Sequence, residues 1–362
     1  MTELPDYISS TRIPAPTPDS IAQDGKVRYG TFDAPFNNLN MLEIAKPCGP
    51  KMPDFMKASR LTEWEAFEVA MDEGALISAV YSVGPIGFSI FVWYDKRDEE
   101  VYTWANFVPK NKAHVAAQLV NDKCYCKTKN SEFTINNDFA NGKASAKGYT
   151  KSKIGEFSID MHFERISPLA NGVMPLAKNK DGSFRNPLYS EKDFFKASGT
   201  ITLNGRAYVT NERSVGIIDD HKGFYPRHAH YDWLTTMGQI DDDGVKKCFA
   251  FNLTRNQSVD QHQYNENVIW IEDKSYPMPP VTFTHETKSD KKNVWHIKDD
   301  AKKGLVDVTF TFEHSFKMPT PAAVCHYVLP FGTISGYVTD TNGKKYVVDG
   351  MLGIGEDKTT NI

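Results

Sequence analysis

Dipeptides that favour tight reversals of the chain recur along this sequence, and they constrain its fold more than any other feature. Among them are Asn-Gly at 141–142, 204–205 and 342–343, and Asp-Gly at 181–182 and 243–244. Such pairs readily adopt the positive φ angles that two-residue β-hairpins require. A chain that reverses so often in this way is expected to consist of antiparallel strands.

Between these turns, apolar residues alternate with polar ones or form short apolar runs, as β-strands require. The segments with this pattern are 75–82, 87–95, 101–108, 156–166, 207–210, 248–254, 267–272, 306–316, 324–330, 333–339 and 345–349. Long helical patterns are scarce, and residues 61–71 suit a short helix and a strand equally well. Many strands at short spacing, joined by hairpins, predict a mainly β protein of antiparallel barrels or sandwiches.

The length of the chain bears on its division into domains. At 362 residues it is too long for one small core, which predicts about two domains. Residues 169–198 are rich in Pro, Gly and Asn without clear periodicity, so we place a boundary there, between domains of residues 1–195 and 196–362. The Pro-rich residues 1–30 are expected to form an extended arm that wraps loosely onto the first domain.

Charge and composition argue against several classes of partner. The net charge is −4 and no basic cluster is present, so we expect no nucleic-acid partner. The N-terminus lacks a cationic start followed by an apolar run, which argues against a secretory signal. No apolar stretch approaches the roughly 20 residues that a transmembrane helix needs. The five scattered cysteines indicate free thiols in a reducing compartment, so a cytoplasmic location is expected.

Residues 219–236, DDHKGFYPRHAHYDWLTT, hold three of the ten histidines together with several carboxylates and aromatic rings. This density of titratable and aromatic side chains is hard to explain as core or as solvated loop. If residues 227–234 are extended, alternate side chains point to opposite faces of the strand. One face would carry His228, His230 and Asp232, and the other would carry Ala229, Tyr231 and Trp233.

Seven phrases, in order along nearly the whole chain, resemble a bacterial family catalogued as domain of unknown function 2804. They are YGTFDAPFNNLN at 29–40, LTEWEAFEV at 61–69, NPLYSEKDFF at 186–195, DDHKGFYPRHAHYDW at 219–233, FNLTRNQ at 251–257, YNENVIW at 264–270 and FGTISGY at 331–337. That family is similar to two-barrel lipocalin-like proteins, whose relatives include carotenoid 1,2-hydratases, AttH-type proteins and fungal cyclases of the Diels–Alderase type.

The resemblance implies two lipocalin-like antiparallel β-barrels packed side by side. It also implies an apolar ligand, isoprenoid-, polyketide- or lipid-like, in a barrel lumen or at the junction of the barrels. Relatives that are enzymes use no organic cofactor. The sequence agrees, since it has no Walker A loop and no GxGxxG motif between a strand and a helix.

One interpretation of the 219–236 segment is acid catalysis. A carboxyl group of Asp232 or Asp220 inside an apolar barrel would have a raised pKa and could protonate an olefin. The rings of Tyr231 and Trp233 would stabilise the resulting carbocation, and His230 would hold the water that adds. Hydration, dehydration and cyclisation all follow from this one step.

Two other interpretations stay open. His228, His230 and Asp232 could bind a metal ion in a facial arrangement, as in non-haem iron or catalytic zinc enzymes. Alternatively, residues 219–223 form a polar turn, His228 and Asp232 belong to a hydrogen-bonded strut, and the protein carries or senses a lipid without transforming it.

A second group of candidates follows further along the chain. Glu266 lies near Trp270 in the sequence and could act with the histidines. Asn252 lies in an apolar run, where a buried amide must find partners, either on a ligand or on a loop backbone. We therefore add Asn252, Trp270 and Tyr225 to the candidate ligand-binding residues.

Overall fold

The computed structural model describes residues 12–167, 170–288, 292–318 and 325–361. In these ranges β-strands dominate, and each pair of neighbouring strands in the sheets is antiparallel. The mainly β, antiparallel architecture predicted from the turns is therefore confirmed. Helical structure in the described part includes α1 (Asp54–Arg60) and the short 3-10 turns η2 (Met41–Glu43), η3 (Lys110–Lys112) and η4 (Phe139–Asn141).

The chain divides into two compact units. Residues 14–226 form the first unit, and residues 227–361 together with residues 12 and 13 belong to the second. The boundary expected between residues 195 and 196 falls inside one continuous strand, β14 (Phe184–Leu203). Residues 186–195 of β14 are all buried, so no alternation of polar and apolar residues marks them as a strand in the sequence.

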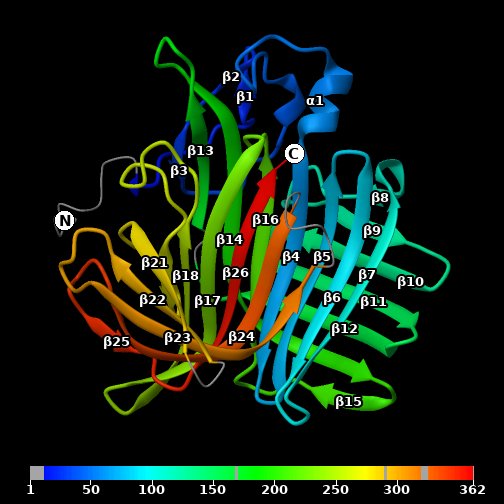
Figure 1. The fold of residues 1–362 in the computed structure, drawn as a ribbon, viewed down its shortest axis with the longest axis vertical. Coiled ribbons are helices and arrows are strands. Elements are labelled where there is room, and N and C mark those ends of the chain that lie inside the picture. The colour runs from blue at the N-terminus through cyan, green and yellow to red at the C-terminus, as the bar shows by residue number, and fades with distance from the viewer. Residues whose placement is uncertain (1–11, 168–169, 289–291, 319–324, 362) are drawn as a thin grey trace. The chain divides into compact units, whose positions relative to one another are not determined.

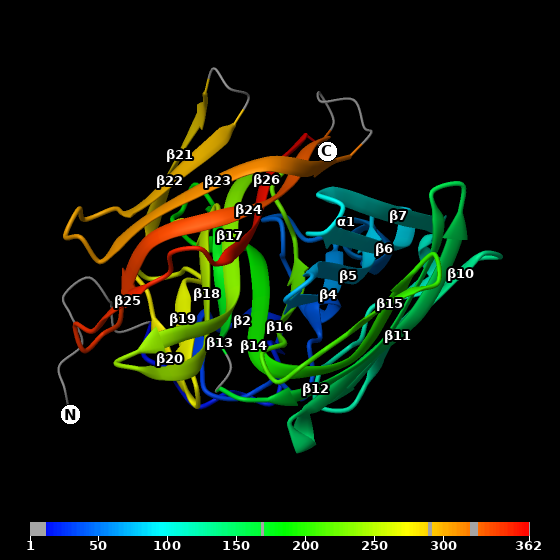
Figure 2. The same cartoon turned by 90° about the horizontal axis from the view of Figure 1, so that it is seen from below.

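The first unit is built on one long sheet that curls into a nearly closed barrel (Figures 1 and 2). Its strand order is β7-β6-β5-β4-β16-β14-β12-β11-β10-β9-β8. The bounds are β4 (Thr62–Met71), β5 (Gly74–Val83), β6 (Ile86–Asp95), β7 (Glu100–Pro109), β8 (Ala113–His114), β9 (Lys123–Lys127), β10 (Ser131–Asp138), β11 (Lys143–Ser152), β12 (Gly155–Arg165) and β16 (Val215–Gly223). Residues 62–71, ambiguous in the sequence, are thus a strand that follows the short helix α1.

Aromatic side chains fill much of the first barrel. Phe67 of β4 stacks on Phe163 of β12, with ring centroids 4.0 Å apart, and Phe195 of β14 packs edge-on against Phe67. Ile218 of β16 belongs to the same buried core. Because side chains two apart on a strand share a face, these residues identify which side of β4, β14 and β16 points into the barrel.

The N-terminal arm packs tightly on the first unit rather than loosely. It contains β1 (Ala22–Gln23), β2 (Lys26–Val27) and β3 (Gly30–Phe32), and β3 pairs with β13 (Ala170–Lys178). Phe32 and Phe36 are almost fully buried in a core that also contains Tyr189 of β14. The ring of Phe36 lies edge-on to Tyr189, with centroids 5.9 Å apart. Residues 1–11 of the expected arm lie outside the described residues.

The second unit is a curved sheet of half-barrel form, with strand order β20-β19-β18-β17-β26-β24-β23-β22-β21. The bounds are β17 (His228–Asp242), β18 (Val245–Arg255), β19 (Val268–Ile271), β20 (Lys274–Pro277), β21 (Val281–Thr287), β22 (Asn293–Asp299), β23 (Val306–Lys317), β24 (Cys325–Thr339) and β26 (Leu352–Asn361). Figure 1 shows β23 and β24 bending through a wide arc. Their concave side carries a core that includes Leu234, Trp295 and Phe310.

Short strands complete the two sheets at the expected turns. β15 (Arg206–Val209) follows β14 through Asn204-Gly205, whose φ angles are +50° and +82°. β17 and β18 are joined in the same way through Asp243-Gly244. β25 (Lys345–Val347) pairs with β24. These are the positive φ angles that the dipeptides predict for tight hairpins.

Candidate functional site

Three carboxyl side chains lie opposite one another across three neighbouring strands of the first barrel. Glu65 of β4 pairs with Asp220 of β16, and Asp220 pairs with Glu191 of β14. All three are fully buried. Carboxylates directly opposite in a sheet repel each other, so this placement works against strand stability. We call Glu65, Asp220 and Glu191 the acid row.

The acid row points into the barrel rather than outward. Glu65 lies two residues before Phe67 on β4, and Asp220 lies two residues after Ile218 on β16. Both Phe67 and Ile218 belong to the barrel core. Alternation along a strand therefore places the carboxyl groups on the same inward face.

Two cations accompany these acids. Lys222 of β16 donates a hydrogen bond to Asp220 Oδ1 at 3.0 Å and is itself buried. Arg165, at the end of β12, donates from Nε to Oδ2 of the buried Asp193 at 2.9 Å. Asp193 lies two residues after Glu191 on β14, so it extends the acid row along the barrel interior.

The charges inside the barrel do not balance if every acid is ionised. Among the described residues around the acid row, the buried carboxyl groups are those of Glu65, Glu191, Asp193 and Asp220, and the cations that accompany them are Arg165 and Lys222. Four negative charges against two positive ones would leave two uncompensated charges in a dry interior, which is very costly. Some of the four carboxyl groups are therefore expected to be protonated near neutral pH.

The direction of each pKa shift agrees with this balance. Burial, reinforced by the nearby charge of Asp220, raises the pKa of Glu65 to about 8. Burial, with the charge of Asp193, raises the pKa of Glu191 well above its usual range. Burial also raises the pKa of Asp193, to about 6, against the opposing effect of Arg165. Glu65 and Glu191 are thus the members that hold a proton at neutral pH.

Several oxygens of this interior accept no hydrogen bond from the described part of the chain. They are Glu191 Oε1, Asp193 Oδ1, Asp220 Oδ2 and Asn137 Oδ1. The other oxygen of Glu191 accepts a hydrogen bond from the Tyr189 hydroxyl. Glu65 differs, because both of its oxygens lie 3.0 Å from Asn137 Nδ2. Glu191 Oε1 is therefore the position from which a protonated acid could donate to a ligand.

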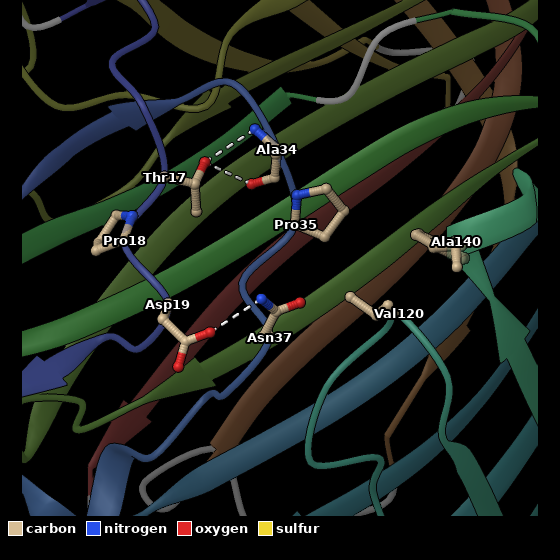
Figure 3. Close-up of a pocket in the computed structure, with 9 residues that line it drawn as sticks. Thr17, Pro18, Asp19, Ala34, Pro35, Asn37, Val120 and Ala140 are labelled. Atoms are coloured by element: carbon tan, nitrogen blue, oxygen red, sulfur yellow. Dashed lines mark hydrogen bonds between the residues drawn. The ribbon is translucent and has the colours of Figure 1, made fainter.

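A surface pocket of about 420 Å³ lies between the N-terminal arm and the segments before and after β10 (Figure 3). Its lining is mostly apolar and includes Pro18, Pro35, Val120 and Phe139, with a few polar groups from the arm. The arm is held in place by its own hydrogen bonds, such as those between Thr17 and the backbone of Ala34, drawn in Figure 3. A volume of this size suits a small organic molecule.

The pocket and the acids share a contact. Phe139 of η4 lines the pocket, and the guanidinium of Arg165 lies over its ring, 4.7 Å from the centroid. The same guanidinium binds Asp193. One aromatic ring and one arginine thus connect the pocket lining to the buried carboxyl groups.

The remaining polar residues of 219–223 lie on the outer face of β16. Trp64 stacks on His221 with ring centroids 4.6 Å apart, and its indole donates to Asp219 Oδ2 at 3.2 Å. His221 Nδ1 lies 3.3 Å from the hydroxyl of Tyr225. Residues 219–223 are therefore a strand and not the polar turn considered above, because they pair with β4 and β14 along their whole length.

The two halves of the 219–236 segment belong to different units. In the second unit His230 and Asp232 share a face of β17 with the core residue Leu234. Tyr231 and Trp233 point to the opposite face. Asp232 and the rings of Tyr231 and Trp233, which the acid-catalysis interpretation placed around one substrate, thus point to different sides of one strand.

Other side chains meet Asp232 on the inward face of the second unit. His230 Nε2 lies 3.4 Å from Asp232 Oδ2, and His285 Nε2 of β21 lies 3.1 Å from Asp232 Oδ1. Asp357 of β26 is paired directly with Asp232. His326 of β24 approaches Asp357 within 3.6 Å. We call His230, Asp232, His285, His326 and Asp357 the histidine–aspartate cluster.

His228 does not join this cluster. It is exposed, and its Nδ1 contacts Asn361 Oδ1 at 2.5 Å. The metal-binding interpretation of the sequence grouped His228 with His230 and Asp232. In the structure, Asp357 and His285 lie beside Asp232 instead. Partners from distant strands, and not the next histidine on β17, surround the carboxylate.

Asn252 and Glu266 form hydrogen bonds with residues outside the histidine–aspartate cluster. Asn252 Oδ1 accepts a hydrogen bond from the Trp233 indole at 2.6 Å, and its Nδ2 donates to the Glu266 carbonyl at 2.9 Å. The Glu266 side chain accepts from Asn256 Nδ2 at 2.6 Å. Trp270 is fully buried. Asn252 thus satisfies a loop backbone, which is the second of the two roles considered for it.

The sequence interpretation did not single out Glu65, Glu191 and Asp193. The alternation of side chains along a strand could have indicated two of these acids. Glu65 lies two residues before Phe67, and Asp193 lies two residues before Phe195, so each acid shares a strand face with a large aromatic residue. An acid on the apolar face of a strand is unusual and indicates a buried carboxyl group.

The fold and these clusters define a class of protein in which curved antiparallel sheets carry titratable side chains on their inward faces. The chain belongs to the family described as Domain of unknown function (DUF2804), whose model matches residues 13–361, and the resemblance inferred from the sequence is confirmed. No curated protein matches the chain. Among the described residues, no helix has the length and apolar character needed to cross a membrane.

Proposed function

We propose that the first unit binds a small, largely apolar molecule and protonates it with Glu191, as in cofactor-independent hydration, dehydration or cyclisation. The observation that carries this proposal is the surplus of buried carboxyl groups over cations inside the barrel. A neutral carboxylic acid in a dry site is a proton donor at neutral pH, a role that an exposed carboxylate cannot perform.

Hydrogen bonding selects Glu191 as the donor. The Tyr189 hydroxyl donates to Glu191 Oε2, which leaves the proton on Oε1 and directed away from Tyr189. After transfer of this proton to an unsaturated carbon, Tyr189 and Lys222, which lie opposite each other on β14 and β16, would stabilise the carboxylate that remains. A proton from the attacking water, or from a neighbouring carbon of the substrate, would restore the acid.

Binding is proposed to begin in the pocket of Figure 3, where Pro18, Pro35, Val120 and Phe139 offer an apolar lining. The reactive end of the molecule would then pass Phe139 and Arg165 to reach the acids. The contact between the Arg165 guanidinium and the Phe139 ring supports this route, since it links the pocket to Asp193.

The test combines ligand identification with isotope exchange. The full-length protein is purified, its co-purifying small molecules are identified by mass spectrometry, and these together with farnesol and oleic acid are incubated in D₂O. Deuterium should appear on carbon in the molecule that reacts, and Glu191→Gln should abolish its incorporation while retaining binding. Glu164→Gln, an exposed glutamate of β12, is the matched control.

Two outcomes would reject the proposal. Equal deuterium incorporation by wild-type protein and Glu191→Gln would remove Glu191 as the acid. Binding that persists when Val120→Trp fills the pocket would remove the pocket as the binding site. Retention of a lipid by wild-type protein without any exchange would identify the first unit as a carrier.

A further inference from the structure

We infer that the second unit binds one divalent transition-metal ion of the zinc type, held by His230, Asp232, His285 and Asp357. This inference concerns a different unit from the acid row and does not depend on the function proposed there. His230, Asp232 and Asp357 each offer one ligand atom, and these atoms all lie within 4.8 Å of one another.

The distances between the Asp232 oxygens and the two imidazoles match those that one ion would impose. Ligands bound at 2.0–2.2 Å, with angles between 90° and 110°, are separated from each other by about 3–3.6 Å. Asp232 Oδ2 lies 3.4 Å from His230 Nε2, and Asp232 Oδ1 lies 3.1 Å from His285 Nε2. Asp357 lies slightly farther away, with its oxygens 3.9 Å from His230 Nδ1 and 3.8 Å from His285 Nδ1. Its side chain and the ring of His285 would turn to place one carboxylate oxygen and Nε2 at the same centre.

A second observation points to a ligand at the same place. Asp232 is 8% exposed, and its Oδ1 accepts no hydrogen bond from the described residues although His285 Nε2 lies 3.1 Å away. The two groups are therefore close without forming a hydrogen bond. An ion between them would give the buried oxygen a partner.

The opposed carboxylates lead to the same conclusion. Asp232 and Asp357 are direct neighbours across β17 and β26, with side chains only 11% and 21% exposed. Two half-dehydrated carboxylates at this separation repel each other. A divalent ion bound between them would neutralise both carboxylates.

The imidazole rings are held by further contacts. His230 Nδ1 lies 2.9 Å from Thr359 Oγ1, which leaves Nε2 for an ion. The ring of His285 stacks on Trp295 with centroids 4.4 Å apart and planes 8° apart. Partners of this kind orient the ligating histidines of metal sites and fix their tautomers.

The donor set selects the class of ion. Two imidazole nitrogens and two carboxylate oxygens suit Zn²⁺ and similar borderline ions better than Mg²⁺ or Ca²⁺, which prefer oxygen ligands alone. The side chains of His230 and His285 are 46% and 34% exposed, so solvent reaches the centre of the cluster. A water molecule could therefore bind the ion as a fifth ligand beside these four side chains.

The experiment titrates the metal-free, full-length protein with ZnCl₂ by isothermal calorimetry, and with CoCl₂ while visible absorption is recorded. We expect one equivalent of each ion to bind, with Co²⁺ showing the spectrum of a nitrogen–oxygen site. Asp232→Asn and His230→Ala should each weaken Zn²⁺ binding at least about 100-fold, because each removes a ligand.

His228→Ala is the matched control, because His228 is an exposed histidine of the same strand outside the cluster. Its Zn²⁺ affinity should stay within about twofold of wild type. Since His230 is half-exposed, His230→Ala should keep the fold of the metal-free protein, which circular dichroism checks. Absence of saturable binding by wild-type protein would overturn the inference, as would an equal loss in His228→Ala and His230→Ala.

Discussion

Asp220 lies directly opposite Glu65 across β16 and β4, and both carboxyl groups are fully buried. This arrangement does not stabilise the sheet when both groups are ionised, because neighbouring carboxylates repel each other and both have lost their hydration. Glu65 therefore binds a proton in the folded protein, and this proton makes the stability of the first unit depend on pH.

Replacement of Glu65 by Gln should reduce this dependence. The pKa of Glu65 is raised from 4.5 to about 8 in the folded protein, so folding takes up a proton between these values. The unfolding free energy of wild-type protein should therefore fall with rising pH, by up to about 1.4 kcal/mol per pH unit from this group. Urea unfolding between pH 5 and pH 8 measures the slope. Glu65→Gln should show a shallower slope, and parallel curves would contradict the assignment.

The protonated state of Glu191 can be observed directly. Burial raises the pKa of this carboxyl group well above its usual range, so it should be neutral at pH 7. Infrared spectroscopy of wild-type protein should then show the carbonyl stretch of a carboxylic acid that shifts in D₂O. The band should lose the Glu191 component in Glu191→Gln, with the Glu65 component remaining, and should be unchanged in Glu164→Gln. An unchanged band in Glu191→Gln would show that Glu191 is not protonated.

Arg12 should stabilise the second unit. Its side chain is 6% exposed and donates to the carbonyl oxygens of Asn265 and Asn267, the latter at 2.5 Å. Arg12→Met removes both charge-assisted bonds and leaves two carbonyls unsatisfied, at a cost of about 2–4 kcal/mol. Thermal unfolding measures the loss. Lys298→Met, at an exposed lysine of the same unit, should change stability by less than about 0.5 kcal/mol.

Two glycines of the β14–β15 region should differ in their tolerance of alanine. A Cβ at Gly199 would lie 2.1 Å from the Asp160 carbonyl oxygen, and its φ is +140°. At Gly205, with φ of +82°, a Cβ would meet nothing within 4 Å. We expect Gly205→Ala to cost about 1 kcal/mol from backbone strain, and Gly199→Ala to cost at least about 3 kcal/mol. Equal losses in urea unfolding would contradict the contact at Gly199.

Local features of the sequence were sufficient to predict the antiparallel strands and their turns. Alternation along β17 also identified His230 and Asp232 as neighbours on one face. Their positions, four and two residues before the core residue Leu234, show which face is inward. Strand alternation and turn residues act within a few positions of the chain, so a single sequence reveals them.

The composition of each cluster could not be predicted in the same way. Asp357 and His285 reach Asp232 only through the pairing of β17 with β26 and the curvature of the second sheet. Likewise, Glu191 meets Asp220 because β14 pairs with β16, a relationship that no local spacing records. Strand pairing between distant segments determines both clusters.

The contacts of Arg12 have a consequence for how the protein is made. Because the second unit includes Arg12 as well as residues 227–361, the first unit is in effect inserted into it. During synthesis, Arg12 emerges from the ribosome before the first unit but meets the carbonyls of Asn265 and Asn267 only after the whole first unit has been translated. A fragment cut at residue 226 would therefore separate the second unit from one of its own buried side chains.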